Sequence, residues 1–531
     1  MCGIFCYVGK NYSEEDLLEN FNRIKLRGPD SSRLIKVDNV LLGFHRLAIN
    51  DISEKGMQPF ISDGLYLICN GEIYNHKELY KLFLSSSCEL KSNSDCEVII
   101  YLYKFFGIER TCQLLDGVFS FVLYDSLKKI VYVARDPYGV RPLFVGEKEN
   151  NEYFFSSEMK AIHDKCTNVR QFDTGSYLEY TPTKFNIQKY HELKRRNLYG
   201  RNFQEEICSY IRNLLINSVE KRLLSDRPIG ALLSGGLDSS LICGIISKLY
   251  KEKSIENKLK TFSIGIKGST DLVYAQNVAD YINSEHHNIE CTEEDFLNAI
   301  PEVIYNIESY DTTTVRASVG NYLVGKYIKE NTDIVVLFNG DGSDEQSGYK
   351  YLRNAPNYNE FQEECLKLLT EIQYFDVLRS DRSVSSRWSL EARTPFLDKE
   401  FVDFYMGIDP ILKMYNSKNK LPEKYMLRKS FENMNIIPDE VLWRPKEAFS
   451  DGCSSETRSW HKVIQEHVDK IISDEEFINN KDKYKINTPV LKESYWYRKL
   501  FNEYYPNKDN VIPHFWLPKW SKVNDPSARE L

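Results

Sequence analysis

The stretch LLSGGLDSSL, residues 232–241, stands where an apolar strand gives way to a helix. Ser234 and the two glycines after it expose backbone N–H groups, and the N-terminus of the following helix adds positive potential, so this turn can bind a phosphate or pyrophosphate. Asp238 would compete with a phosphate for those donors unless it holds a Mg²⁺ ion that bridges the phosphates. No lysine follows the glycines, which distinguishes this turn from the loop used in γ-phosphoryl transfer.

Apolar strands and helices alternate on both sides of this turn. Such alternation indicates buried parallel strands covered by helices, which predicts a doubly wound α/β sheet. A long amphipathic helix over 205–224 precedes the alternating region, and the pattern beyond Glu345 is mostly helical, which predicts a helical extension. The predicted strands cover 227–234, 261–266 and 333–340, and the predicted helices between them cover 240–250 and 272–282.

Acidic residues follow another predicted strand of the same region, in VVLFNGDGSDE (residues 335–345). Ligands of open α/β sheets bind outside the carboxyl ends of the strands, so Asp341, Asp344 and Glu345 are candidates for lining a ligand crevice. Taken alone, the two glycines of the first turn could form a tight turn, and the acidic loop could be a solvated helix cap. Two such loops in one alternating domain favour a nucleotide site.

Residues 1–190 follow a different pattern, in which short strands succeed one another with turns between them. GVFSFVLYD (117–125) and KIVYVARD (129–136) are examples, and such runs predict antiparallel sheets. Helical spacing of apolar residues interrupts them at 76–84 and 95–107, so we expect layered sheets with helices. A polar, charged linker over 189–206 separates this region from the alternating one, and we therefore expect two domains.

The chain begins MCGIF, with a cysteine directly after the initiator methionine. Cys2 could simply begin a buried strand, because cysteine is among the most buried residue types. A small second residue also allows the methionine to be removed, which would leave a thiol and an α-amine on one residue. The amine titrates near ~8 and the thiol near ~8.5, so the pair can act as base and nucleophile. The first five residues leave both interpretations open, and the second predicts a mature protein that begins at Cys2.

Composition excludes several classes of protein. The 531 residues exceed one ordinary core, and 42% hydrophobic with 27% charged residues is typical of soluble globular chains. A net charge of −8 without a basic tract predicts no nucleic-acid binding. Twelve cysteines without a C-x-x-C pair argue against a disulfide scaffold or structural zinc. No apolar run approaches the ~18 residues of a membrane span, so we expect a cytoplasmic protein without a membrane partner.

Two motifs far apart in the chain resemble motifs of known families. SGGLDSS (234–240) resembles the pyrophosphate-binding loop of the ATP pyrophosphatases, and the N-terminal Cys-Gly-Ile resembles the class II glutamine amidotransferases. Their combination, in this order and over essentially the whole chain, resembles the glutamine-hydrolysing asparagine synthetase family. Supporting stretches are RGPD (27–30), HRLAIND (45–51), QPF (58–60), NGEIYNHKEL (70–79), SDCEVI (94–99), SYDTTTVRAS (309–318), EARTPFLDKEF (391–401) and RPKEAFSDG (444–452).

This resemblance implies a fold and a reaction. Residues 2–190 would form an αββα N-terminal-nucleophile glutaminase domain, and residues 205–531 a doubly wound parallel ATP-pyrophosphatase domain with a helical extension. The implied enzyme is an ATP-dependent carbon–nitrogen ligase of amino-acid biosynthesis. It would transfer ammonia from L-glutamine to L-aspartate through β-aspartyl-AMP, giving L-asparagine, L-glutamate, AMP and pyrophosphate. ATP is then a substrate, Mg²⁺ is the implied metal, and a homodimer is compatible with the family.

At the glutamine end, the resemblance makes Cys2 the nucleophile that attacks the side-chain amide and forms a thioester. Asn70 and the backbone N–H of Gly71 match the family's oxyanion hole, which the negative tetrahedral state requires. Arg46 matches the partner of the substrate carboxylate and Asp95 that of its ammonium, which are the expected pairings for a free amino acid. The other residues of the implied glutamine pocket are Leu47, Ala48, Ile49, Asn50 and Glu72.

At the nucleotide end, the resemblance implies sites for ATP, for a metal and for aspartate. Asp238 and Asp344 would hold Mg²⁺ and pyrophosphate, and Asp341 would act on the intermediate. The implied ATP-binding residues are Leu232, Ser234, Gly235, Gly236, Asp238, Ser239, Ile264, Asn339 and Gly340. The charged residues that match the surroundings of aspartate and its intermediate are Arg316, Asp376, Arg379 and Lys446.

Two stretches depart from the family pattern. The family usually has Ser-Gly-Glu-Gly-Ser-Asp-Glu where this chain has NGDGSDE (339–345), so Asp341 is one methylene shorter than the expected glutamate. SDRSVSSRWSLEAR (380–393) departs from the usual run of small residues near the aspartate site. Two alternatives remain: a related amidotransferase that activates another carboxylic acid, and a catalytically silent relative that binds nucleotide or amino acid. Cys2 and the SGGLDSS loop argue against the silent relative.

Overall fold

The computed structural model is described over residues 1–84, 88–193, 204–415, 421–446, 452–454, 458–521 and 523–527. The chain divides into two compact units. Unit 1 comprises Met1–Glu192, Leu224–Arg227 and Ser385–Glu391, and unit 2 comprises Leu193–Leu223, Pro228–Val384 and Ala392–Leu531. Most of the charged linker predicted over 189–206 lies outside the described residues.

Unit 1 contains two six-stranded sheets whose paired strands run antiparallel, as the short strands predict. In spatial order the first sheet consists of β10 (Asn168–Gln171), β8 (Phe144–Lys148), β9 (Glu152–Ser156), β1 (Gly3–Val8), β3 (Val40–Arg46) and β2 (Ser31–Val37). The second consists of β12 (Lys184–Lys189), β11 (Ser176–Thr181), β7 (Ile130–Arg135), β6 (Gly117–Asp125), β5 (Leu65–Ile73) and β4 (Phe60–Ser62).

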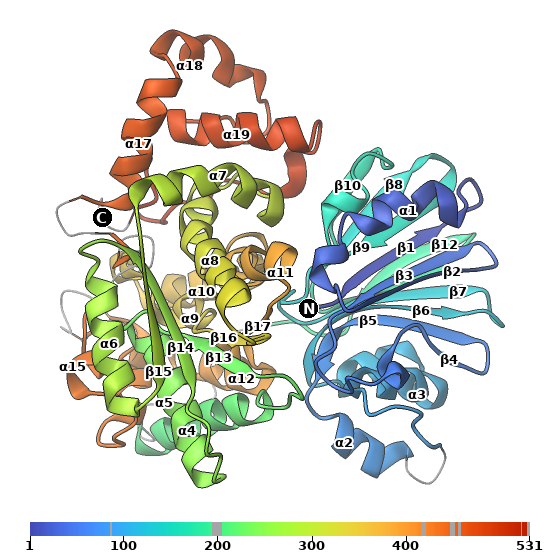
Figure 1. Ribbon diagram of the computed structural model, residues 1–531, viewed down its shortest axis with the longest axis horizontal. Coiled ribbons are helices and arrows are strands. Elements are labelled where there is room, and N and C mark those ends of the chain that lie inside the picture. Colours follow the sequence, from blue (N-terminus) through green and yellow to red (C-terminus); the bar gives the residue numbers. More distant parts are fainter. Residues whose placement is uncertain are drawn as a thin grey trace. The chain divides into compact units, whose positions relative to one another are not determined.

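Alternating side chains of these strands build four layers. Ile4 and Cys6 of β1 share a core with Val122 of β6, so this core lies between the two sheets. Helix α3 (Val98–Leu114) packs on the other face of the second sheet, and α1 (Glu14–Asn22) covers the first sheet through Phe21, whose ring lies 6.1 Å from that of Phe5. Figure 1 shows the two stacked sheets with helices outside them. The predicted αββα arrangement is confirmed.

The second helical stretch of unit 1 matches its prediction better than the first. Residues 95–97 form a 3₁₀ turn, after which α3 continues to Leu114. The predicted helical stretch over 76–84 is confirmed, although it consists of a short α2 (His76–Leu79) followed by a π-helical turn over Tyr80–Leu84. Apolar spacing does not distinguish these hydrogen-bonding patterns, which differ by only one residue per turn.

Unit 2 is built around a sheet of five strands, four of which are paired in parallel. Their spatial order is β15 (Glu285–Cys291), β14 (Lys260–Ile266), β13 (Ile229–Leu232), β16 (Val336–Phe338) and β17 (Glu391–Arg393). β13 pairs in parallel with β14 on one side and with β16 on the other. The chain therefore proceeds from β13 outward to β15 and returns to the opposite side of β13. This reversal confirms the doubly wound topology and places a switch point between β13 and β16.

Helices connect the strands of unit 2 and form its extension, as predicted. The three-residue β17 and the polar β15 were not predicted, because neither carries a continuous apolar run. The helices of the connecting region are α4 (Gln204–Lys221), α5 (Leu237–Glu252), α6 (Thr270–Ile282), α7 (Glu293–Ile307) and α8 (Thr312–Asn331). The later helices of unit 2 are α9 (Ser343–Ser347), α10 (Tyr358–Glu371), α12 (Lys399–Gly407), α13 (Pro410–Lys413), α14 (Tyr425–Phe431), α15 (Asp439–Leu442), α17 (Trp460–Ile471), α18 (Asp474–Asn480) and α19 (Lys492–Tyr504). Most of α11 (Ser383–Trp388) belongs to unit 1.

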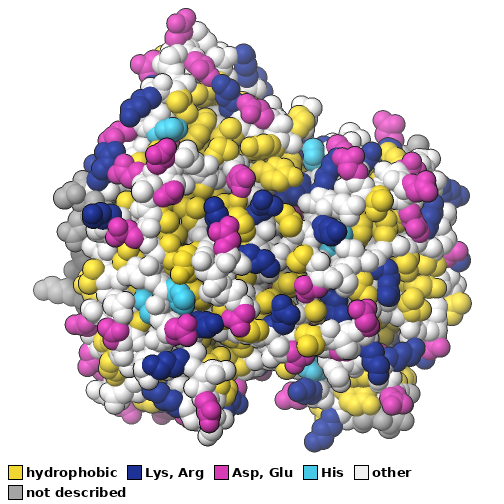
Figure 2. Space-filling view, in the orientation of Figure 1, with side chains coloured by type: hydrophobic (Ala, Val, Ile, Leu, Met, Phe, Trp, Pro, Cys, Tyr) yellow, Lys and Arg dark blue, Asp and Glu magenta, His cyan; other side chains and the backbone are white. Residues whose placement is uncertain are grey.

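The surface carries charges of both signs. Basic and acidic side chains are interspersed over the face drawn in Figure 2, so no single-sign field dominates that face. None of the described helices combines the length and apolar character that crossing a bilayer requires.

Candidate active sites

Cys2 directly precedes β1, beside the end of the neighbouring β3. Its Sγ donates a long hydrogen bond of 3.7 Å to the carbonyl of Leu47. The Nε of Arg27 donates to the Cys2 carbonyl at 3.1 Å, and the same guanidinium forms a buried ion pair with Glu158 at 2.7 Å. The backbone at Cys2 is therefore held by a buried charge pair, which leaves the thiol as the group that can react.

Burial has opposite effects on the two ionisable groups at this terminus. It raises the pKa of the Cys2 thiol to about 11, and it lowers the pKa of the Met1 α-amine to about 6. At neutral pH the thiol is thus protonated and an amine in this environment is mostly in its basic form. The Cys2 thiol therefore needs a base in order to react, and burial at this terminus keeps the neighbouring Met1 α-amine mostly neutral.

Asn70 and Gly71 lie on β5, in the second sheet of unit 1. Asn70 is 1% exposed, and within the described part of the chain no group hydrogen-bonds to its side-chain amide. Buried polar groups are nearly always satisfied, so an amide without a partner fits one that a ligand satisfies. Donors of this kind stabilise an oxygen that becomes negative during acyl transfer.

The loop over residues 47–51 contacts Cys2 through Leu47 and the carboxylates of Glu72 and Asp95 through Asn50. The Asn50 amide donates to Glu72 and, at 3.3 Å, to Asp95. Asp95 also accepts from the backbone N–H of Ile73 at 2.6 Å, and burial raises its pKa above the ordinary value. The predicted glutamine-pocket residues Asn50, Glu72 and Asp95 are thus brought together.

Arg46 is buried and hydrogen-bonded to the loop that follows it. Its guanidinium donates to the carbonyl of Ser53 at 2.6 Å and to that of Asp51. The neighbouring Ala48 donates its backbone N–H to Asp30 at 2.8 Å, so RGPD and HRLAIND are tied together. Because its two amino groups are fixed on carbonyl oxygens, the guanidinium keeps its full positive charge in a set orientation.

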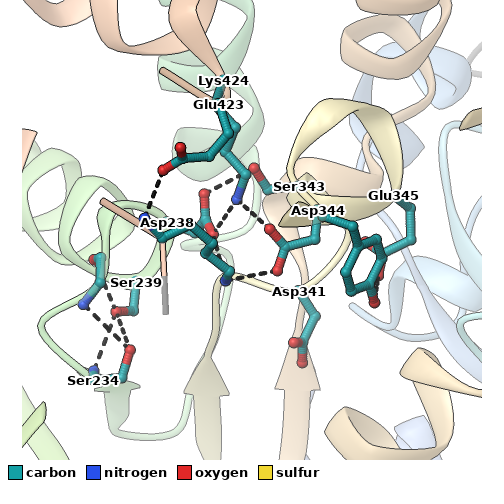
Figure 3. A network of polar contacts seen from close by, with 12 residues as sticks. Ser234, Asp238, Ser239, Asp341, Ser343, Asp344, Glu345, Glu423 and Lys424 are labelled. Atoms are coloured by element: carbon teal, nitrogen blue, oxygen red, sulfur yellow. Dashed lines mark hydrogen bonds and ion pairs between the residues drawn. The ribbon is translucent and has the colours of Figure 1, made fainter. Parts of the chain in front are cut away.

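In unit 2, the turn after β13 and the loop after β16 meet at the switch point of the sheet. The backbone N–H of Ser234 donates to the Ser239 hydroxyl at 3.1 Å, and the two serine hydroxyls lie 3.0 Å apart. Ser343 of the second loop donates to Asp238 of the first at 2.8 Å. Figure 3 shows these residues converging from the two loops.

Two positions in these loops have room only for glycine. Gly235 has a φ of +73°, which L side chains rarely adopt, and an added Cβ would lie 2.5 Å from the backbone N of Ala275. A Cβ on Gly340 would lie 2.8 Å from the backbone N of Ser239. Glycine at 235 therefore lets the SGG turn pass close to α6, and glycine at 340 lets the GDGSDE loop approach the SGGLDSS turn.

Two lysines join the carboxylates of Asp238 and Asp344. Lys424 Nζ lies 2.5 Å from an oxygen of Asp238 and 2.6 Å from one of Asp344, and Lys446 Nζ lies 2.7 Å from the other oxygen of Asp344. Burial alone would raise the pKa of Asp344, but the two ammonium groups bring it well below its usual range. Lys424 is 2% exposed and has a φ of +57°, an uncommon conformation that often marks functional positions.

Arg379 organises a second cluster of carboxylates. Its guanidinium lies 2.8 Å from Asp376, 3.5 Å from Asp341 and 4.0 Å from Glu345. The Tyr349 hydroxyl lies 2.8 Å from both Glu345 and Asp376. Burial raises the pKa of Asp341, and the charge of Asp376 adds to this effect while Arg379 opposes it. Asp341 is therefore a carboxylate whose protonated form is favoured by its surroundings.

A single cavity contains most of the residues that the sequence predicts for the nucleotide and acid sites. Arg379 and Lys446 reach it, whereas Asp376 contacts it only through Arg379 and Tyr349. Arg316 and Gly235 do not line it. The predicted residues that line the cavity are Leu232, Ser234, Gly236, Asp238, Ser239, Ile264, Asn339, Gly340, Asp341, Asp344, Arg379 and Lys446.

Arg316 lies on α8 with its guanidinium away from this cavity. It forms two hydrogen bonds to Glu493, at 2.8 and 2.6 Å, and two to Asp525, at 2.8 and 2.9 Å. The side chain is 3% exposed. For the aspartate-binding role implied for Arg316, the substrate would have to displace one of these two carboxylates.

Sequence reasoning missed several residues that line the cavity. Lys424 stands 186 positions from Asp238, in a stretch without a recognisable pattern, so no local signal could have found it. Arg444 stacks on the Tyr274 ring at 3.8 Å and donates to the Gly235 carbonyl at 3.1 Å. Its position in RPKEAFSDG, two residues before Lys446, was the available signal.

The carboxylate oxygens of Asp238 and Asp344 are suitable ligands for a Mg²⁺ ion that also binds phosphate. Mg²⁺ prefers hard oxygen ligands and is commonly bound through one or two carboxylates together with substrate phosphates. Among the described residues, no group of three or more His, Cys, Asp or Glu side chains could hold a metal by itself. The two carboxylates are thus suited to a metal that arrives with a nucleotide.

Comparisons with known proteins match both parts of the chain. A family model described as a glutamine amidotransferase domain matches residues 1–197, and one described as asparagine synthase matches 210–359 and 347–524. The chain is 42% identical over 560 aligned positions to the glutamine-hydrolysing asparagine synthetases of Cricetulus griseus, Gallus gallus and Homo sapiens. Each alignment covers 100% of this chain and 98% of the relative.

Proposed function

The chain belongs to the glutamine-hydrolysing asparagine synthetases, and on that basis we propose how its own residues divide the work. The enzyme synthesises asparagine, with glutamine as the nitrogen donor. In our proposal residues 2–190 form the glutaminase domain and residues 205–531 the synthetase domain. Glutamine is hydrolysed at Cys2, and aspartate is activated in the cavity of unit 2.

At Cys2 the reaction needs a nucleophile, a base and an oxyanion hole. Removal of Met1 would place an α-amine on Cys2, one residue from the position where burial lowers the pKa of the Met1 α-amine to about 6. The amine takes the thiol proton as Sγ attacks the glutamine amide carbon. The orphan amide of Asn70, with the backbone N–H of Gly71, donates to the developing oxyanion. Ammonia leaves with the transferred proton, and water then hydrolyses the thioester to glutamate.

The substrate's charged ends are held by groups of opposite sign. The buried guanidinium of Arg46 takes the α-carboxylate, and Asp95 with Glu72 takes the α-ammonium, because a free amino acid must be recognised at both ends. Asn50 bridges the two carboxylates and fixes their positions. The backbone of Leu47, Ala48 and Ile49 completes the pocket.

In unit 2 we propose that ATP lies across the switch point of the sheet. Its base and ribose lie near Leu232 and Ile264, and its phosphates lie on the Ser234–Ser239 turn beside Asn339 and Gly340. Mg²⁺ held by Asp238 and Asp344 would neutralise the phosphates and make pyrophosphate a better leaving group. Lys424 and Lys446, which now neutralise the same carboxylates, would turn to the pyrophosphate.

We assign the part of the cavity around Arg379 and Asp341, here called the acid end, to the binding of aspartate. Its β-carboxylate attacks the α-phosphorus of ATP, pyrophosphate leaves, and β-aspartyl-AMP remains. Arg379 provides the positive charge for substrate carboxylate, with Asp376 fixing its orientation at 2.8 Å. Ammonia then attacks the acyl carbon and AMP leaves. Asp341 accepts a proton from the attacking nitrogen, since it is the carboxylate that lines the cavity next to Arg379.

One observation carries this assignment more than any other. A single cavity contains the SGGLDSS turn, the GDGSDE loop and Arg379, so the groups for a nucleotide and for a small acid share one space. The cavity does not favour a catalytically silent binding protein, because binding alone does not require the Asp341 carboxylate beside Arg379. The proposal also includes a cytoplasmic location and a homodimer, which rest on the sparse cysteines and on the family.

A substitution at Cys2 tests the division into two sites. Cys2→Ala removes the nucleophile, so glutamine-dependent asparagine synthesis should fall by more than 10³-fold, while synthesis from added ammonium salts stays near the wild-type rate. Cys6→Ala is the matched control, because Cys6 lies four residues away on β1, is buried, and should leave both activities intact. A folded Cys2→Ala enzyme that loses both activities would refute the division.

A further inference from the structure

The C-terminal segment of unit 2, residues 509–521 and 523–527, contributes to the cavity. Trp516 and Pro526 of this segment line it, although they stand more than 120 positions after Arg379 in the sequence. Trp516 is 8% exposed, and its ring lies 5.4 Å from that of Tyr349 and 5.8 Å from that of Tyr351. The Tyr349 hydroxyl in turn contacts the carboxylates beside Arg379. The segment therefore forms a wall at the acid end.

Two polar anchors fasten this wall to α8, the helix whose Thr313, Ala317 and Asn321 line the cavity. At the start of the helix, Asp311 accepts the backbone N–H of Trp516 at 2.7 Å while capping the backbone N–H of Thr314 at 2.9 Å. One turn further, Arg316 binds Asp525 through two hydrogen bonds. The first anchor holds the cavity-lining Trp516 itself, and the second holds Asp525, which directly precedes the cavity-lining Pro526.

The second anchor is rigid. Arg316 is held from its other side by the 1% exposed Glu493 of α19, which also accepts from the Tyr497 hydroxyl at 2.9 Å. Asp525 receives two further bonds at 2.8 Å, from the Gln465 side-chain amide and from the backbone N–H of Ser527. With two carboxylates on one guanidinium, the charge of Arg316 is fully matched. A substrate carboxylate would have to displace one of them, against the cost of an unpaired buried charge.

We propose that Arg316 is a positioning residue, which acts on the reaction by clamping the C-terminal wall through Asp525 and does not contact aspartate. The wall excludes water from the acyl adenylate. An acyl adenylate is a mixed anhydride that water cleaves to aspartate and AMP, so each water molecule admitted wastes one ATP without forming asparagine. Excluding water from a reactive intermediate is a recognised role of closed active sites. The inference rests on the proposed assignment of this cavity to aspartate activation.

The test measures the ratio of AMP to asparagine formed, with saturating ammonium so that Cys2 is bypassed. Asp525→Asn keeps the shape of the side chain but removes the charge that Arg316 clamps. We expect this variant to raise the ratio at least threefold and to lower kcat/KM for aspartate about tenfold, since small displacements in an active site have effects of that order or larger. Asp509→Asn is the matched control, because Asp509 pairs with Arg498 at 2.6 Å and does not line the cavity.

Two further variants separate the alternatives. Trp516→Ala should also raise the ratio, and Trp516→Phe should restore it, because the Asp311 anchor uses only the backbone and survives both changes. If Arg316 binds aspartate directly, Arg316→Lys raises KM while Asp525→Asn and Trp516→Ala keep the wild-type ratio, and the proposal is overturned. Should Asp525→Asn fail to fold, the Trp516 pair decides. A wild-type enzyme that forms ADP and phosphate, in place of AMP and pyrophosphate, from ATP, aspartate and ammonium would instead refute the adenylation itself.

Discussion

Replacing the buried Lys424 should lower both the stability of unit 2 and the rate of adenylation. The sequence did not suggest this residue. Lys424→Met keeps the length of the side chain and removes its ammonium. In the structure this ammonium is 2% exposed and makes close contacts with Asp238 and Asp344, at 2.5 and 2.6 Å. After the change Asp344 keeps Lys446 at 2.7 Å, whereas for Asp238 that lysine is 3.8 Å away.

Two magnitudes follow from this geometry. Removing one partner of a buried ion pair typically costs 3–5 kcal/mol, and because Lys446 still compensates Asp344, we expect unit 2 to lose about 3 kcal/mol of stability. In the reaction, one charge-assisted hydrogen bond to pyrophosphate is lost, which is worth roughly 1.5–3 kcal/mol. At about 1.4 kcal/mol per factor of ten, adenylation should slow by roughly 10- to 150-fold.

Aspartate-dependent exchange of labelled pyrophosphate into ATP measures this step directly. Glutaminase activity in the same preparation reports that unit 1 is intact, and Lys429→Met is the control, because Lys429 is exposed and pairs with Glu432 on the surface. The reasoning is refuted if Lys424→Met exchanges pyrophosphate within threefold of the wild-type rate with an unchanged thermal transition.

Two other predictions follow from the same structure. Asp341→Asn should nearly abolish asparagine formation from ammonium while glutaminase activity survives, and Asp341→Glu should retain or improve asparagine formation. If Asp341→Asn forms asparagine at the wild-type rate, the carboxylate has no role in the mechanism. Burial lowers the pKa of Lys413 from 10.5 to about 8, so the unfolded chain binds more protons between these values and native stability rises with pH across that window. Lys413→Met should therefore be more stable than wild type at pH 7, by up to about 3 kcal/mol, with a gap that closes toward pH 10 in denaturant titrations; a gap independent of pH would contradict this.

The sequence predicted the elements that carry a strong local signal. β6 matches the predicted strand 117–125, and α5 and α6 begin within three residues of their predicted starts. β15 was missed because its sequence, EHHNIEC, is mostly polar. The rule that ligands bind beyond the carboxyl ends of parallel strands predicted Asp341 and Asp344 at a ligand crevice, and both line the cavity together with Asp238 of the SGGLDSS turn.

Contacts between distant segments could not be predicted in this way. Lys424 reaches Asp238 across 186 positions, and Arg316 reaches Asp525 across 209. Neither pair leaves a periodic pattern, because each is set by how whole elements pack. The family resemblance implied that Arg316 lies around the aspartate site, whereas in the structure its guanidinium pairs with two carboxylates that do not line the cavity.

The account as a whole rests on the transfer of one aspartate oxygen. If the β-carboxylate attacks the α-phosphorus of ATP, one oxygen of that carboxylate must leave with AMP when ammonia displaces it. Aspartate labelled with ¹⁸O in the β-carboxylate, supplied with ATP and amide-¹⁵N glutamine, should therefore give AMP that carries one ¹⁸O and asparagine that carries ¹⁵N and the other ¹⁸O. Mass spectrometry that finds the ¹⁸O in inorganic phosphate, with ADP as the nucleotide product, would contradict it.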